Sequence, residues 1–263
     1  MRILLLSDIH ANLEALDACL AVAPSHDAIA NLGDIVGYGA SPNEVTDRSR
    51  ALGGPLVRGN HDKACSGVSS LEFFNPIAGL AALWTQENLT PENYTFLRDL
   101  PAGPLPLEGI ASPPATEAEP PSPVYLVHGS PVDEDEYIIT IRDALDVLMR
   151  SSVRLTFFGH THLQGWFGLD SENGALAMRP QYETRDQFET LDLELERDSK
   201  YLVNPGSIGQ PRDADWRAAF ALFDSERYVV TFLRVPYDVK GAQQRIRDAG
   251  LPDRLAARLA EGR

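Results

Sequence analysis

The chain has few cysteines and no long apolar run. Cys19 and Cys65 are the only cysteines among 263 residues, too few for a disulfide framework. No stretch approaches the roughly 20 consecutive apolar residues that a membrane-spanning helix needs. The apolar start, residues 1–6, is too short for the core of a secretory signal. These absences predict a cytoplasmic protein that does not enter a membrane.

Positive charge is also scarce. The sequence holds 23 Lys and Arg against 38 Asp and Glu, so its formal net charge is −15. A surface of this sign repels phosphate backbones, which argues against long nucleic acid as a partner. Bound cations would reverse the field inside a single cleft, so a small phosphoester can still be a substrate. The sequence leaves open whether the chain forms a homo-oligomer.

The length and composition predict one domain, residues 1–263, with ample apolar content (43%) for a core. Residues 111–122, ASPPATEAEPPS, contain only Ala, Ser, Thr, Pro and Glu. Such a segment cannot bury apolar area, so it predicts a flexible insertion. Residues 239–263 predict C-terminal helices broken near Gly250 and Pro252.

The order of apolar runs predicts an α/β fold. In the first part of the chain, short apolar runs alternate with helical patterns, as in parallel sheets buried on both faces. The strands expected there span residues 3–7, 27–34, 55–62, 124–130 and 155–162. After residue 163 the apolar runs follow one another across short turns, which predicts antiparallel strands. The change of pattern indicates two sheets.

Residue types that bind metals follow the expected strands of the first part. Five of the six histidines belong to this set, which comprises Asp8, His10, Asp34, Asn60, His61, His128, His160 and His162. Ligands of α/β sheets bind outside the carboxyl ends of the strands, so these side chains should converge. Each short motif alone also fits an ordinary loop or turn. Their joint occurrence at every strand end indicates a metal site.

The motif series DIH, GD, GNHD, HG and GHTH resembles the calcineurin-like metallophosphoesterase superfamily. With GDIVGYG, HGSP and NPGSIGQPRD, it most resembles the small prokaryotic phosphodiesterase-type members, over residues 4–213. The resemblance implies a four-layer α/β/β/α sandwich of two mixed β-sheets flanked by helices. It also implies a site for two divalent ions, with Mn²⁺ first and Fe²⁺, Zn²⁺, Ni²⁺ or Mg²⁺ as alternatives.

Carried onto this sequence, the family pattern implies two ligand sets that share one carboxylate. They are Asp8, His10, His162 and Asp34 for one ion, and Asp34, Asn60, His128 and His160 for the other. His61 would lie near the leaving group as the general acid. Two ions about 3.5–4 Å apart can clamp the attacking and leaving oxygens of a phosphate ester and supply a bridging hydroxide. A general acid typically adds a ~10²–10⁴-fold rate enhancement.

Three further features are open to two interpretations each. Arg212 either belongs to a plain glycine-proline turn or binds a substrate phosphate. Tyr38 is either a packed side chain or a wall of the substrate pocket. The acidic residues 132–137 form either a solvated loop or a gate or cation site at the cleft.

The expected activity is hydrolysis of small nucleotide-like phosphodiesters. Protein phosphatases of the superfamily carry a second acid and an arginine after the GD motif, whereas Ile35, Val36, Gly37 and Tyr38 follow Asp34 here. This departure disfavours phosphoproteins as substrates. The alternatives are a dinucleoside-polyphosphate hydrolase, a phosphomonoesterase, or a metal-bearing scaffold without activity. The scaffold members tend to lack the histidine that His61 matches.

Overall fold

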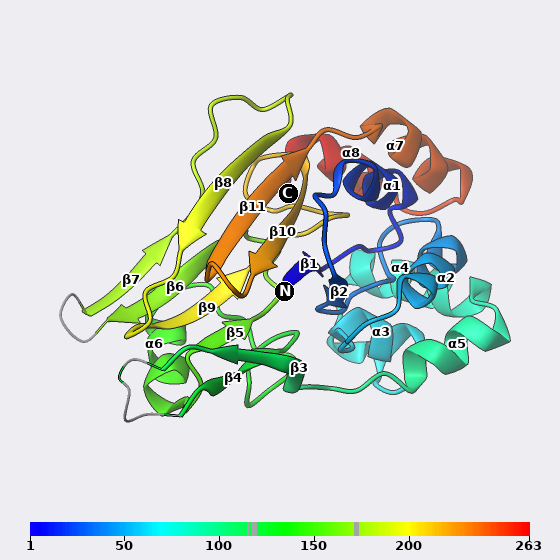
Figure 1. Ribbon diagram of the computed structural model, residues 1–263. Helices are drawn as coiled ribbons and strands as arrows, with labels where there is room; N and C mark the ends of the chain where they lie inside the picture. The colour runs from blue at the N-terminus through cyan, green and yellow to red at the C-terminus, as the bar shows by residue number, and fades with distance from the viewer. Residues whose placement is uncertain (115, 117–119, 171–173) are drawn as a thin grey trace.

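In the computed structural model, two mixed sheets pack face to face and helices cover their outer faces (Figure 1). The structure describes residues 1–114, 116, 120–170 and 174–263. The elements in chain order are β1 (Arg2–Leu6), α1 (Leu13–Val22), β2 (Ala28–Asn31), α2 (Pro42–Leu52), α3 (Asn60–Cys65), a 3₁₀ turn (Leu71–Phe73), α4 (Pro76–Asn88), α5 (Pro91–Arg98), β3 (Leu105–Ser112), β4 (Ser122–Leu126), α6 (Ile141–Arg150), β5 (Leu155–Phe157), β6 (Gly165–Asp170), β7 (Gly174–Met178), β8 (Glu189–Glu194), β9 (Lys200–Asn204), β10 (Ala218–Asp224), β11 (Val229–Val235), α7 (Val239–Asp248) and α8 (Asp253–Glu261).

Both sheets mix parallel and antiparallel strands. The first has the order β2-β1-β10-β11-β8, in which only β1 and β2 are parallel. The second has the order β3-β4-β5-β9-β6-β7, with β4, β5 and β9 parallel. The predicted α/β sandwich of two mixed sheets is therefore confirmed. The later strands β6, β10 and β11 pair with antiparallel neighbours, as their short connections predicted.

Three apolar layers hold the sandwich together, and β1 shows how its sequence serves two of them. Leu4 and Leu6 face the helices, whereas Ile3 and Leu5 face the other sheet, because successive side chains of a strand alternate. Across the sheets, the rings of Phe157 and Phe223 lie 5.2 Å apart. Each fully buried leucine stabilises the fold by about 1.5–3 kcal/mol. β1 thus joins the helical layer to the sheet-to-sheet core.

The strand expected at residues 55–62 is wrong. Leu56 forms only an isolated parallel bridge with Asn31, at the edge of the first sheet. The N–H of Arg58 then turns away and donates to the carbonyl of Pro101 (2.8 Å). Helix α3 begins at Asn60, because the Asp62 carboxylate accepts the N–H of Gly59 (2.9 Å) and caps the first turn. The GNHD motif therefore opens a helix instead of ending a strand.

The segment predicted as a flexible insertion, residues 111–122, connects β3 to β4. Ala111 pairs with Pro123 and Ser112 with Ser122, so the ends of the segment belong to an antiparallel hairpin. Of the segment for which flexibility was predicted, residues 115 and 117–119 lie outside the described residues. The sequence did not predict β7, the short exposed strand GALAM, or β8, in which polar and apolar residues alternate. Within the described ranges, no helix has the length and apolar character to cross a membrane.

Candidate metal centre

The polar residues singled out in the sequence meet at one edge of the sandwich. Asp8 and His10 follow β1 and Asp34 lies shortly after β2, all in the first sheet. His128 follows β4, while His160 and His162 follow β5 in the second sheet. The carboxyl ends of strands from two different sheets therefore form the site, where the sequence alone suggested one open sheet. All of these side chains are buried.

The backbone is left-handed at five of these residues. The φ angles of Asp8, His10, Asp34, His160 and His162 lie between 48° and 65°. A non-glycine residue held there costs about 1–3 kcal/mol, and such residues concentrate at functional sites. Among the described residues only four other non-glycine residues have positive φ: Ala11, Tyr38, Ala214 and Tyr228. The fold thus strains the chain where the polar side chains converge.

Asp8, His10, Asp34 and His162 form the first group that could hold an ion. The Nε2 atoms of His10 and His162 lie 3.0 Å apart. The Asp8 carboxylate is 3.3 Å from Nε2 of His162, and the Asp34 carboxylate is 3.5 Å from Nε2 of His10. Two carboxylates and two imidazoles therefore place ligand atoms that all lie within 4.8 Å of one another.

Asp34, His128 and His160 form the second group. The Oδ2 atom of Asp34 lies 3.4 Å from Nε2 of His128, and Oδ1 of Asn60 lies 3.3 Å from that same nitrogen. Asp34 belongs to both groups, so one carboxylate could bridge two ions. The structure brings all seven residues that the sequence proposed as ligands into these two adjacent groups.

Each of the four imidazoles has one nitrogen bound to a backbone carbonyl. In His10, Nδ1 donates to the carbonyl of Val36 (3.0 Å). In His128 it donates to the carbonyl of Leu32 (2.8 Å), and in His162 to that of Gln210 (2.5 Å). In His160 it is Nε2 that donates, to the carbonyl of Asp135 (3.1 Å). We assign these tautomers from the acceptors, since a carbonyl can only accept.

The remaining nitrogen of each ring points into the cluster, and its lone pair can bind a cation when that nitrogen carries no proton. Such N–H contacts orient metal-binding histidines. In His10 and His162, two lone pairs face each other at 3.0 Å, which fits a cation between them. The mixed nitrogen and oxygen donors suit Mn²⁺, Fe²⁺, Zn²⁺ or Ni²⁺.

Opposite charges dominate the centre of the cluster. Burial alone would raise the pKa of Asp34, but His128, His61 and His10 hold it well below its usual value. Burial opposes a charge on His128 as well, yet the Asp34 and Asp8 carboxylates raise its pKa to about 10. Asp34 is therefore a carboxylate, and it attracts positive charge strongly.

Two further aspartates are harder to ionise. Burial raises the pKa of Asp8 to about 7, and the nearby Asp34 charge adds to the effect. Asp62, also raised to about 7 by burial and Asp34, accepts the N–H groups of Ile35 and Val36 (2.8 and 3.2 Å). Asp62 thus ties the loop after Asp34 to helix α3, a structural role in the position where many superfamily members carry glutamate.

His61 lies beside the two groups and in neither of them. Its backbone N–H donates to Oδ1 of Asp34 (2.8 Å), and its Nδ1 has no hydrogen-bond partner among the described residues. A side chain on Gly37, whose φ is 87°, would come within 2.3 Å of that Nδ1, so glycine is required there. Burial lowers the pKa of His61 to about 4. The imidazole is therefore neutral at pH 7 unless a bound anion stabilises its protonated form.

A cavity of about 390 Å³ opens onto the second group. Its lining includes His61, His160, Tyr38, Tyr137 and Phe74. The ring of Tyr38 packs against His61 with centroids 4.3 Å apart, and Phe74 meets the other side of His61 at 4.8 Å. This cavity is the candidate substrate cleft.

The two candidate substrate residues are in contact with each other. The Arg212 guanidinium donates to the Tyr38 hydroxyl (3.2 Å) and is a hydrogen-bond partner of Tyr137. Tyr38 is 7% exposed, so it is a packed side chain that also forms a wall of the cleft. Arg212 lies next to the cleft and belongs to the turn that follows β9.

The sequence left open whether the acidic segment 132–137 belongs to the site. Glu134 forms a two-bond ion pair with Arg58 (2.9 Å each) and contacts Lys63 (3.1 Å). This anchors the carbonyl of Asp135 against His160, and the Tyr137 ring stacks on the same imidazole at 3.7 Å. In the sequence, the only local signal for this contact is the aromatic Tyr137 at the end of the acidic run. The segment is a largely exposed loop, as one interpretation had it, but it is docked through Glu134 and lines the cleft.

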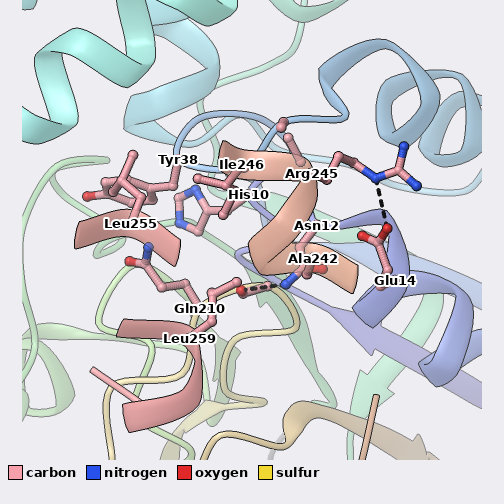
Figure 2. Close-up of a pocket in the computed structure, with 14 residues that line it drawn as sticks. His10, Asn12, Glu14, Tyr38, Gln210, Ala242, Arg245, Ile246, Leu255 and Leu259 are labelled. Atoms are coloured by element: carbon pink, nitrogen blue, oxygen red, sulfur yellow. Dashed lines mark hydrogen bonds and ion pairs between the residues drawn. The ribbon is translucent and has the colours of Figure 1, made fainter. Parts of the chain in front are cut away.

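A second cavity, of only about 10 Å³, lies behind His10 and Tyr38 (Figure 2). Residues of α7 and α8 close it, among them Leu255 and Leu259, and the Gln210 side chain lies beside them (Figure 2). On its far side, Arg245 of α7 pairs with Glu14 of α1 (2.8 Å). The C-terminal helices are therefore packed against the back of the metal-ligand loops.

Comparison with known proteins agrees with this geometry. The model of the calcineurin-like phosphoesterase superfamily domain matches residues 1–227. An uncharacterised protein of Methanocaldococcus jannaschii is 36% identical over 99% of this chain and 98% of its own length. The crystal structure of a metallophosphoesterase from Sphaerobacter thermophilus superposes with a TM-score of 0.79 at 38% identity, covering 100% of this chain and 99% of that one. A hypothetical protein of Pyrococcus horikoshii shares the fold (TM-score 0.74, 21% identity, 100% and 98% coverage).

Proposed function

The chain belongs to the calcineurin-like phosphoesterase superfamily, and we propose that it is a two-metal phosphodiesterase acting on small nucleotide-like diesters. Membership indicates a phosphoric ester hydrolase with an Asp/His metal centre. The observation that supports two ions is the position of Asp34, which belongs to both ligand groups. Bound ions would supply charge neutralisation and activation of water. We propose Mn²⁺ as the first metal to test.

The residues around the two groups suit an anionic ester. The cleft beside the second group would receive the leaving group, with the aromatic rings of Tyr38, Tyr137 and Phe74 on its walls. His61 faces this cleft and would protonate the leaving oxygen once a bound phosphate has raised its pKa. Arg212 would bind a phosphate oxygen with its guanidinium.

The net charge of −15 supports a small diffusible substrate over long nucleic acid. A cytoplasmic location remains a prediction from the sequence.

Two other functions remain as alternatives to be tested. A dinucleoside-polyphosphate hydrolase or a phosphomonoesterase would use the same metal groups, and only the cleft would select the substrate. A metal-bearing scaffold would have no need of a histidine that points into the cleft. The presence of His61 beside Asp34 favours catalysis over the scaffold.

A substrate screen on metal-loaded protein decides among these functions. The purified chain, stripped of metal and reloaded with Mn²⁺, Zn²⁺, Ni²⁺ or Mg²⁺, is assayed with bis(p-nitrophenyl) phosphate, p-nitrophenyl phosphate and diadenosine tetraphosphate. We expect the diester to have the highest kcat/KM, with Mn²⁺ as the metal. Faster turnover of the monoester would indicate a phosphomonoesterase, and faster turnover of the tetraphosphate would indicate a dinucleoside-polyphosphate hydrolase. If the metal-loaded wild type and its His61→Ala variant both hydrolyse none of the three substrates, the protein is a scaffold.

A further inference from the structure

Two arginines from distant parts of the chain flank Tyr38. The guanidinium carbon of Arg212 lies 5.8 Å from the centre of the Tyr38 ring. Arg258, on helix α8, lies at the same distance from the same ring. That ring packs in turn on His10 and His61, at 4.7 and 4.3 Å. The two positive charges therefore stand one aromatic ring away from the metal centre.

Neither arginine is paired with an Asp or Glu side chain in the part of the chain that the structure describes. The hydrogen bonds of Arg212 go to Tyr38, Gln210 and Tyr137. Arg258 donates through Nε to the main-chain oxygen of Arg263, the last residue of the sequence. Burial, followed by the Arg212 charge, lowers the pKa of Arg258. Acids outnumber bases 38 to 23 in this chain, so two neighbouring arginines that no Asp or Glu side chain balances are a costly arrangement.

The same cluster contains two buried donors that find no acceptor in the described ranges. They are Nε of Arg212 and Nε2 of Gln210. Gln210 is 1% exposed, and its own side-chain oxygen accepts from Arg212 (3.2 Å). A buried donor without a partner costs about 1–3 kcal/mol. An anionic oxygen bound at this cluster would satisfy both donors and neutralise the two arginines.

We propose that Arg212 and Arg258 form an anion subsite that binds a second phosphate group of the substrate, next to the phosphate that is hydrolysed. This inference rests on the proposed function. A guanidinium matches phosphate geometry with two parallel N–H donors, and two guanidiniums suit a doubly charged group. Arg258 lies beyond residues 1–227, the part matched by the superfamily model, so the subsite is a feature that α8 adds to the common site.

The test is the affinity of the Mn²⁺-loaded protein for AMP and ADP, measured by isothermal titration calorimetry. The wild type should bind ADP at least ~10-fold more tightly than AMP, because a hydrogen bond to a charged group is worth about that factor. Arg258→Gln should bring the affinity ratio close to one, and Arg258→Lys should keep part of it. Arg254→Gln is the control, because Arg254 is exposed on the same helix and pairs with Glu261 (3.4 Å). It should keep the wild-type ratio.

Chelation of free Mn²⁺ by ADP is identical for every variant, so a change of the ratio between variants reports the arginine. Inorganic pyrophosphate, titrated in the same way, shows whether two phosphates are recognised without a nucleoside. If Arg258→Gln fails to fold, Arg212→Gln tests the same point, because it should also lose the preference for ADP over AMP. Equal affinities of the wild type for AMP and ADP, or an unchanged ratio in folded Arg258→Gln, would overturn the subsite. Loss of the ratio in a protein that hydrolyses no phosphoester would uphold the subsite and reject the proposed function.

Discussion

At the scale of single residues, burial determines what each side chain can do. His61 is 3% exposed and packs against three other rings, and its pKa of about 4 follows from that burial. Asp34 is equally buried but remains charged, because His128 lies 3.4 Å from its carboxylate. The same low exposure therefore gives one neutral group and one charged group. Their neighbours account for the difference.

His61 can be tested through the leaving group of the substrate. If His61 protonates the leaving oxygen, His61→Ala should slow an alkyl diester about 10²–10⁴-fold. Hydrolysis of bis(p-nitrophenyl) phosphate should slow much less, because p-nitrophenolate leaves without a proton. Steady-state kcat for the two esters, in wild type and variant at equal metal content, gives the comparison. An equal loss on both esters would assign His61 to positioning and exclude the general-acid role.

Asp34 can be tested through metal content. Asn in place of Asp34 keeps an oxygen for the N–H of His61 but removes the charge shared by the two groups. Asp34→Asn should therefore bind at most one Mn²⁺ per chain, against two for the wild type, by elemental analysis after dialysis. Asp146→Asn, an exposed change of the same kind on α6, should retain both ions. Two ions retained by Asp34→Asn would rule out the bridging role.

Single residues of the candidate site were the easiest part to predict. Seven proposed ligands lie within a few residues of an apolar run or a glycine turn, so their neighbourhood marks them locally. Gln210 and Asp135 escaped prediction, because each acts through a backbone carbonyl. Every residue type has that group, so no sequence pattern can mark it.

At the scale of elements, the acidic segment 132–137 acts as a brace for His160. The Glu134–Arg58 pair and Lys63 fasten one end of it, while Asp135 and Tyr137 contact the imidazole. The segment is anchored by charge, and the anchoring residues precede it by about 70 positions. The local composition alone could not predict this contact.

Loosening the brace should weaken one metal ion selectively. Glu134→Gln removes the charge that holds Arg58 and Lys63, so the Asp135 carbonyl is no longer fixed against His160. We expect the affinity for the second ion to fall about 10–100-fold, the usual effect of losing a group that orients a ligand. Stepwise Mn²⁺ titration by calorimetry measures it. Glu136→Gln, an exposed change in the same segment, should leave both affinities unaltered, and a similar affinity in Glu134→Gln would contradict the bracing role.

The failed strand at residues 55–62 shows where element prediction stops. PLVRGNHD has the apolar start of a strand, and Leu56 does reach the sheet edge. Asp62 then caps a helix, and a side-chain cap competes with strand extension in a way that hydrophobic periodicity does not register. Connection length predicted the antiparallel pairing of β10 with β11, but not that β9, which was expected to be antiparallel, also pairs in parallel with β5.

At the scale of the whole molecule, metal binding should depend on pH. Asp8 has a pKa of about 7, so it loses its charge as the pH falls below 7. His128 has a pKa of about 10, so it carries a proton at pH 7 that an ion must displace. Mn²⁺ affinity should therefore rise from pH 6 to pH 9, with protons released on binding. Titration calorimetry in buffers of different ionisation enthalpy measures that release, and a flat affinity over this range would contradict it.

The global arrangement was predictable only in part. The two sheets follow from the order of strands, but their convergence into one site requires β1 and β5, more than 140 residues apart, to end at the same edge. The resemblance to a family carried that information, whereas periodicity did not. Arg258 shows the remaining limit, since nothing around it in α8 indicates a contact with Tyr38.

The left-handed backbone at five ligands has a consequence for how fast ions are taken up. That conformation exists in the chain itself, held by carbonyl contacts and buried packing. Loading should then require no rearrangement of the loops, and the uptake rate should increase linearly with ion concentration. Stopped-flow tryptophan fluorescence on mixing with Mn²⁺ would follow it. An uptake rate that levels off at high Mn²⁺ concentration would indicate a slow opening step before binding, and a metal site that is not already formed in the free protein.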